Sequence, residues 1–133
     1  MIRHATADRE YQLVQLRLSQ AYQDMATADI NQLMQLYAPD AVIQSPKEAP
    51  VAGTAAIRAF WLATFDRFRV ELAPQVQEVT SAADAVVVRG RATGTLTSHT
   101  GEPHHVDSWF LQVYRKQPDG TLLFWRGANG PNP

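Results

Sequence analysis

Hydrophobic positions in the first half of the chain recur at the spacing of an α-helix. A first stripe, opposed by polar Gln and Arg side chains, predicts a long amphipathic helix and consists of Tyr11, Val14, Leu18, Ala21, Tyr22 and Met25. Asp29, with Gln32 three residues later, is typical of an N-cap and its capping partner, and predicts a second helix that ends at Pro39-Asp40. A third helix is expected from Thr54, its predicted cap, with the most regular apolar face of the chain: Ile57, Phe60, Trp61, Thr64, Phe65 and Phe68.

Beyond Arg69 the pattern alternates and β-branched residues dominate, which is typical of strands. After a short strand at 41–44, four long strands are predicted over roughly 70–80, 85–98, 105–116 and 122–128. Turn residues between them indicate sequential antiparallel pairing. Helices followed by strands predict an α+β fold, with the helices on one face of a curved sheet. Gly90 and Gly94 are the positions where we expect the sheet to bend.

Composition narrows the class of protein. A chain of 133 residues that is 45% hydrophobic can build a single core, so we expect one domain over 1–133 with its core at about 8–129. The net charge of -1 is spread along the chain, which argues against nucleic-acid and membrane partners. The lack of cysteine excludes thiolate chemistry and disulfides, and no stretch resembles a signal peptide or a membrane span, so we expect a cytoplasmic protein.

The stretch HHVDSW, residues 104–109, is open to three interpretations: metal ligands, an acid/base pair, or ordinary side chains of a half-buried strand. Strand alternation places His105, Asp107 and Trp109 on one face and His104 on the other. The His-x-Asp spacing occurs in facial-triad iron sites, but the third ligand would have to be His99 or His4. We therefore expect no metal site.

Two motifs, LYAPDAVIQSP (36–46) and VAGTAAIRAFW (51–61), resemble the nuclear transport factor 2-like superfamily. Within it, the chain is most similar to the SnoaL-like and ketosteroid-isomerase-like branch. The final hairpin, WFLQVYRKQPDGTLLFWRGAN, is also similar, so the resemblance covers about residues 24–129. It implies a cone: three N-terminal helices packed on a strongly curved, mainly antiparallel sheet, with a mostly apolar pocket at the open end and commonly a homodimer through the sheet. Functions in this superfamily range from isomerases, cyclases and dehydratases to non-catalytic assembly domains.

The residues of steroid isomerisation are only partly matched. Ketosteroid isomerase uses an aspartate base opposite an oxyanion hole formed by a tyrosine and a protonated aspartic acid. By resemblance, Ser45 stands at the position of the base, Ala21 with Tyr22 beside it stands at the position of the tyrosine, and Asp107 corresponds to the oxyanion aspartic acid. A serine hydroxyl is too weak a base to remove a proton from carbon unaided, so steroid isomerisation is not expected.

The resemblance directs Asp107 into the cone, together with His105 and Trp109. Desolvation beside an aromatic wall would raise the pKa of Asp107 and make it the acid/base residue, with His105 as its partner. The alternative is an aspartate paired with a backbone amide or with an arginine such as Arg89, Arg91 or Arg126. The predicted ligand contacts are Tyr22, Gln44, Ser45, Trp61, Trp109 and Asn129, although Gln44 and Ser45 could equally cap a loop, the tryptophans could be core residues, and the segment that holds Asn129 could be frayed.

Two functions follow as hypotheses. In the first, the cone binds a small, largely apolar molecule, polycyclic or carbonyl-bearing, and supports cofactor-free isomerisation, cyclisation or dehydration by proton transfer. In the second, the domain is a non-catalytic ligand-binding or assembly module. The assembly module would have a filled cone and an apolar sheet face at a subunit contact, as in the superfamily's kinase-association domains.

Overall fold

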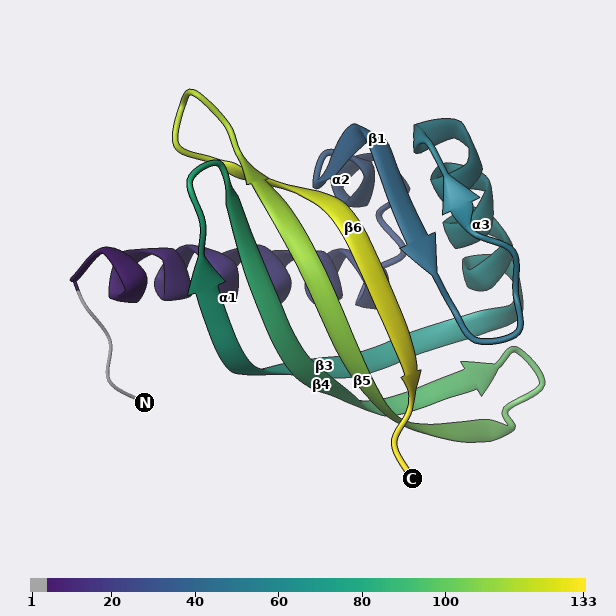
Figure 1. Ribbon diagram of the computed structural model, residues 1–133. Coiled ribbons are helices and arrows are strands. Elements are labelled where there is room, and N and C mark those ends of the chain that lie inside the picture. Colours follow the sequence, from purple (N-terminus) through teal and green to yellow (C-terminus); the bar gives the residue numbers. More distant parts are fainter. Residues whose placement is uncertain (1–4) are drawn as a thin grey trace.

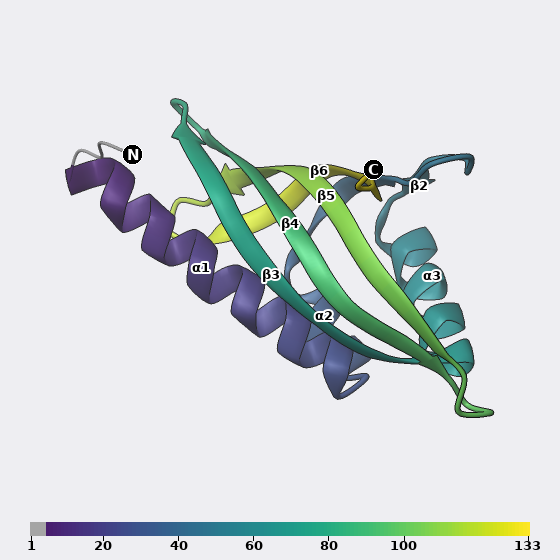
Figure 2. The same ribbon diagram turned by 90° about the horizontal axis from the view of Figure 1, so that it is seen from below.

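The fold is a bent antiparallel sheet wrapped over one long helix. The computed structural model describes residues 5–133, and their side chains from Asp8 onward. Helix α1 (Ala5–Ala26) crosses the concave side of a six-stranded sheet, and α2 (Ile30–Met34) and α3 (Thr54–Arg67) lie at one end of it (Figures 1 and 2). The predicted α+β cone, three helices against a strongly curved and mainly antiparallel sheet, is confirmed. None of the described helices is long and apolar enough to cross a membrane.

The strands follow the predicted meander, with one addition. The order across the sheet is β2-β1-β6-β5-β4-β3, and the strands are β1 (Tyr37–Gln44), β2 (Val51–Ala52), β3 (Phe68–Ser81), β4 (Ala85–Ser98), β5 (Pro103–Lys116) and β6 (Leu122–Pro131). From β3 to β6 each strand pairs antiparallel with the next, as predicted. The parallel pairing of β1 with β6 was not predicted, because no local turn connects these two strands.

Two predicted helix boundaries are wrong, while one cap is confirmed. Asp29 caps α2 as expected, its carboxylate accepting from the Gln32 amide at 3.1 Å. The helix then ends at Met34, and Pro39-Asp40 lies inside β1, where the register with β6 shifts. Proline has no N–H to donate, so a strand tolerates it where the ladder is interrupted.

The third helix begins differently from the prediction. Gly53, with φ 87°, occupies the N-cap position without a side-chain cap, and Thr54 is the first helical residue. The carbonyl of Gly53 accepts from the Ile57 amide at 3.0 Å and closes the first turn. A left-handed backbone conformation therefore starts this helix, and the predicted Thr54 cap is wrong.

Hydrophobic packing fills only the part of the concavity that α1 covers. Val14, Leu18 and Met25 of the predicted stripe are buried there against the sheet and α2. In α3 only Ile57 is fully buried. Phe60, Trp61 and Thr64 of the predicted face are partly exposed, because they face a cavity rather than a packed core. Phe68, also expected in that helix, begins β3 instead.

The curvature depends on the close approach of β3 to β4. A Cβ atom at Gly94, whose φ is 149°, would overlap the carbonyl of Glu71. A Cβ atom at Gly90 would overlap the Phe110 ring and the Gln75 carbonyl, next to a register shift between Val76 and Glu78 in β3. The two predicted bend positions are thus positions where only glycine fits.

The two faces of β5 are both partly apolar. On the concave face Phe110 and Tyr114 are each 3% exposed, whereas on the outer face Trp109 is 42% and Leu111 46% exposed. Asp107 lies on this outer face and is bound by Arg91 of β4. Phe110 and Tyr114 thus contribute to the core, and Trp109 and Leu111 face outward.

Replacing Gly94 by alanine should destabilise the fold much more than the same change at Gly101. Gly94→Ala combines backbone strain with overlap against Glu71, so its unfolding free energy should fall by about 3 kcal/mol. Gly101 also has a positive φ, but a Cβ atom added there would meet open space, so Gly101→Ala should cost only about 1 kcal/mol. Urea unfolding measures both values, and equal stability of the two variants would contradict this explanation of the bend.

Candidate functional site

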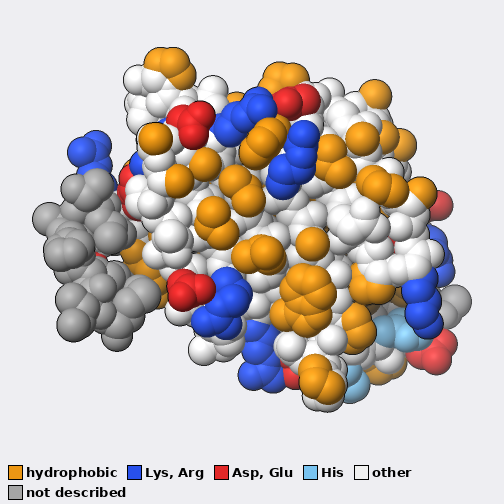
Figure 3. Space-filling model, in the orientation of Figure 1, with side chains coloured by type: hydrophobic (Ala, Val, Ile, Leu, Met, Phe, Trp, Pro, Cys, Tyr) orange, Lys and Arg blue, Asp and Glu red, His pale blue; other side chains and the backbone are white. Residues whose placement is uncertain are grey.

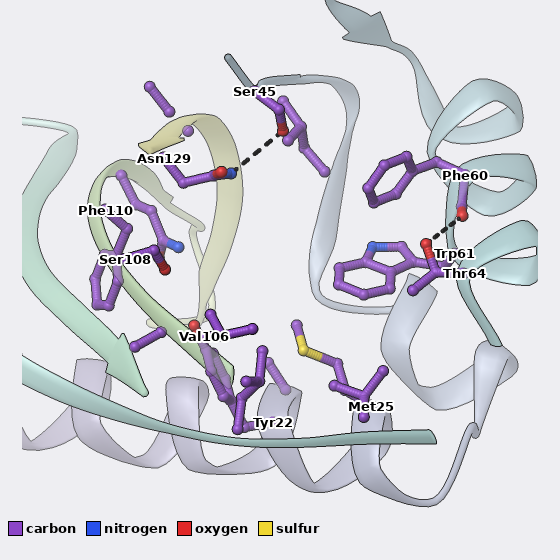
Figure 4. Close-up of a pocket in the computed structure, with 18 of the residues that line it drawn as sticks. Tyr22, Met25, Ser45, Phe60, Trp61, Thr64, Val106, Ser108, Phe110 and Asn129 are labelled. Atoms are coloured by element: carbon purple, nitrogen blue, oxygen red, sulfur yellow. Dashed lines mark hydrogen bonds between the residues drawn. The ribbon is translucent and has the colours of Figure 1, made fainter. Parts of the chain in front are cut away.

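A cavity of about 650 Å³ occupies the open end of the cone. We call it the cone cavity, and its size falls within the range of small-molecule sites. Figure 4 shows it between three walls: Phe60 and Trp61 of α3, Ser108 and Phe110 of β5, and Tyr22 and Met25 of α1. The space that side chains leave unfilled between α3 and the sheet is therefore a cavity lined mainly by apolar side chains.

The α3 wall is aromatic and held in place. Trp61 stacks on Phe65 with ring centroids 5.7 Å apart and meets Phe60 edge-on at 5.3 Å. Its Nε1 donates to the Tyr37 hydroxyl at 3.0 Å, which fixes the indole from β1. Trp61, a predicted ligand contact, thus lines the cavity and offers a rigid surface to a flat molecule.

Three tyrosines and a glutamine are among the polar residues that line the cavity. The Tyr114 hydroxyl donates to Gln112 Oε1 at 2.6 Å, and Phe124 packs edge-on against both Tyr37 and Tyr114, at 5.0 and 5.8 Å. Burial raises the pKa of Tyr22 to about 12 and also raises the pKa of Tyr37 and Tyr114. All three hydroxyls therefore keep their protons near neutral pH.

Of the predicted contacts Gln44, Ser45 and Asn129, only the last two line the cavity. The side chains of Ser45 and Asn129 meet at its mouth, with 3.5 Å between Oγ and Nδ2 (Figure 4), and both residues line the cavity. Gln44 instead points to its own loop and donates from Nε2 to the carbonyls of Ser45 and Glu48, at 3.2 and 3.0 Å. Gln44 is thus a loop-capping residue, and the alternative interpretation holds for it.

Asp107 does not point into the cone. Arg91 donates to its carboxylate from Nε at 2.8 Å, and Asn132 donates from Nδ2 at 2.7 Å. These two hydrogen bonds, the one from Arg91 first, lower the pKa of Asp107 to about 2. The predicted inward orientation and raised pKa are wrong, and the alternative of an arginine partner is what the structure shows.

The same correction applies to the neighbours of Asp107 on β5. Alternation was correct, but Phe110 and Tyr114 occupy the concave face, so His105, Asp107 and Trp109 share the outer one. Trp109 covers Gly130 on the outside of β6. His105 and Asp107 border the cavity only at its exposed rim.

The histidines in the described part of the chain do not assemble around Asp107. His99 hydrogen-bonds through Nε2 to the Phe65 carbonyl at 3.0 Å, which joins the β4–β5 turn to the end of α3. His4 lies outside the described residues. Within residues whose side chains are described, no group of three His, Asp or Glu side chains could hold a metal ion.

Tyr37, Gln112 and Tyr114 are among the lining residues that sequence reasoning missed. Tyr37 was assigned to a helix rather than to β1, and Gln112 and Tyr114 were placed on the face opposite Asp107. The signal that could have found Gln112 and Tyr114 is the i, i+4 pair Phe110 and Tyr114, two large rings on one face of a strand. A sheet that packs on helices is expected to bury the face that carries two such rings.

Comparison with known proteins agrees with the fold. The family model described as SnoaL-like domain matches residues 18–124. No curated protein matches the chain. Structure comparison finds a ketosteroid isomerase-like protein from Erwinia carotovora atroseptica, with a TM-score of 0.81, 22% identity, and coverage of 92% of this chain and 96% of that one.

Two further solved structures have the same architecture. A conserved protein from Planctomyces limnophilus has a TM-score of 0.84 at 16% identity, covering 95% of this chain and 98% of its own. An NTF2-like protein with a cystatin-like fold from Novosphingobium aromaticivorans has a TM-score of 0.74 at 18% identity, covering 92% and 82%. At these identities the likeness extends to the fold alone. With residues 18–124 matched by its family model, the chain belongs to the SnoaL-like domain family.

Proposed function

We propose that this SnoaL-like protein binds a small, largely apolar molecule, with a ring system and a carbonyl group, in the cone cavity. Members of the family bind small molecules, and some act as isomerases or dehydratases. The observation that carries the proposal is an open cavity of about 650 Å³ with an aromatic wall and uncharged tyrosine and glutamine groups among its lining residues. Such a site stabilises a ligand by burying its apolar surface and orients it through a few polar contacts.

The geometry supports binding more directly than proton abstraction. Among the described lining residues the carboxylates are Glu48 and Asp107, and both are exposed at the rim. Asp107 is also held as an anion by Arg91, so it is a poor general acid. Isomerisation, cyclisation or dehydration in this cavity would therefore rely on neutral donors that polarise a carbonyl group.

Filling the cavity from α1 should weaken binding. Ala21 lines the cavity, so Ala21→Phe would place a ring in the space that the ligand needs. The affinity for 1-tetralone, a bicyclic ketone, should fall by at least about tenfold when measured by isothermal titration calorimetry.

Two variants serve as controls for this experiment. Ala63→Phe adds the same ring to an exposed position of α3 and should leave the affinity unchanged. Asp107→Asn should also leave it unchanged, because that carboxylate faces outward. Equal binding by Ala21→Phe and wild type would show that the probe does not occupy the cone.

For the outer face of the sheet, the proposed partner is a second copy of this chain. We define the outer-face patch as Trp109, Leu111 and Val113 of β5. Figure 3 shows groups of hydrophobic side chains among charged ones on the face of the molecule that it presents. Ion pairs surround the outer-face patch, and they are Arg91–Asp107, Arg89–Glu78 and Arg115–Asp40. An apolar centre with a polar rim is typical of protein interfaces, and a patch of this kind can pair with its own copy about a two-fold axis. These features support a homodimer through the sheet.

A charge in the centre of the outer-face patch should abolish the dimer. Leu111 and Leu62 are both 46% exposed, but Leu62 lies on α3, away from the patch. Leu111→Glu should sediment as a monomer across the micromolar range, because a dimer would bury a carboxylate in the apolar centre of each patch. Leu62→Glu should sediment as a dimer like the wild type. A monomeric wild type, or a dimer unaffected by Leu111→Glu, would refute the interface.

A further inference from the structure

Gln112 has spare hydrogen-bond donors, and its orientation is fixed by a neighbour. Tyr114 donates its only hydroxyl proton to Gln112 Oε1 at 2.6 Å. The opposite orientation of the amide would leave this buried hydroxyl without an acceptor, at a cost of about 1–3 kcal/mol. The Nε2 end therefore remains as the free end of the amide. Among the described residues nothing accepts its two N–H groups.

Two tyrosines add donors of the same kind. The Tyr37 oxygen accepts from Trp61 Nε1 at 3.0 Å, and this bond leaves the hydroxyl proton of Tyr37 unused within the described part of the chain. The Tyr22 hydroxyl has no hydrogen-bond partner among the described side chains and backbone groups. Phe124 contacts the rings of both Tyr37 and Tyr114, so the groups from β1 and β5 share one wall of the cavity.

The unused hydrogen-bond donors of these residues determine which kind of ligand fits. Gln112 and Tyr37 present donors whose own acceptor atoms are already engaged by Tyr114 and Trp61. Arg17 also lines the cavity with its Nε bound to the Leu122 carbonyl, and its positive charge adds to the donor character. A donor buried by a ligand without an acceptor would be left unsatisfied. A matching ligand therefore brings an acceptor oxygen to this end of the cavity.

We propose that Gln112, oriented by Tyr114, is the principal donor to a ketone oxygen of the bound ring system, with Tyr37 and Tyr22 as accessory donors. The inference rests on the proposed function and deepens it, because it names the group that is recognised and the residue that recognises it. Gln112 is the binding residue, and Tyr114 is a positioning residue that acts through it.

The test compares two probes that differ only in the acceptor. 1-Tetralone and tetralin have the same fused rings, but only the first has a carbonyl oxygen. In Gln112→Leu, which removes the amide and keeps a similar shape, the affinity for 1-tetralone should fall about tenfold. The affinity for tetralin should change by less than about twofold, since apolar burial is preserved.

The positioning role of Tyr114 has its own readout. Tyr114→Phe keeps the ring and frees the amide to rotate, so the preference for ketone over hydrocarbon should fall about threefold. A purely structural role would weaken both probes equally and leave that ratio unchanged. The wild-type protein provides a measurement that needs no variant: the carbonyl stretch of bound 1-tetralone should lie at lower frequency than that of the ketone in hexane.

The outcomes separate the two proposals. Binding of both probes with equal affinity, unaffected by Gln112→Leu, would overturn the donor assignment while the cavity remained a ligand site. Binding of neither probe would overturn the proposed function and this inference with it. A hexane-like carbonyl frequency in the bound ketone would also overturn the donor assignment, whatever the stability of the variants.

Discussion

The close approach of β3 to β4 at Gly90 and Gly94 is the constraint that shapes the whole molecule. A side chain at either position would overlap neighbouring atoms. Because both residues are glycines, the strands can approach closely and the sheet can curve over α1 instead of lying flat on it. Because α1 fills only part of that concavity, α3 encloses the remainder with an aromatic wall and buries only Ile57 completely. The cone cavity is thus a consequence of how the chain bends, and it is the part of the apolar interior that no described residue fills.

Inside this cavity, the arrangement of hydrogen bonds affects ligand recognition more than any charge does. Tyr114 and Trp61 use the acceptors of Gln112 and Tyr37, and donors remain that have no partner in the described part of the chain. In a site sheltered from water such donors are costly unless a ligand satisfies them. Asp107, the residue that family resemblance singled out, has a different role. It joins β4 and the C-terminal segment through Arg91 and Asn132 on the outer face.

Local patterns predicted much of this fold. The spacing of Ile57, Phe60 and Trp61 identified the inner face of α3, and the alternation from residue 70 onward identified the meander. The parallel pairing of β1 with β6 joins distant segments, and nothing local encodes it. Which face of β5 points inward could not be decided either, because Trp109 and Leu111 make one face as apolar as Phe110 and Tyr114 make the other. The resemblance through Asp107 then selected the wrong face, and Gln112 was missed with it.

A crystal structure of the protein bound to 1-tetralone would decide whether the cone recognises a ketone through Gln112. We predict that the ring system lies against Trp61 in the cone cavity, with the ketone oxygen about 3 Å from Gln112 Nε2. A ketone oxygen that points to the mouth at Ser45 and Asn129 would contradict the donor assignment. A probe bound only on the outer face, near Trp109, would contradict the proposal that the cone is the binding site.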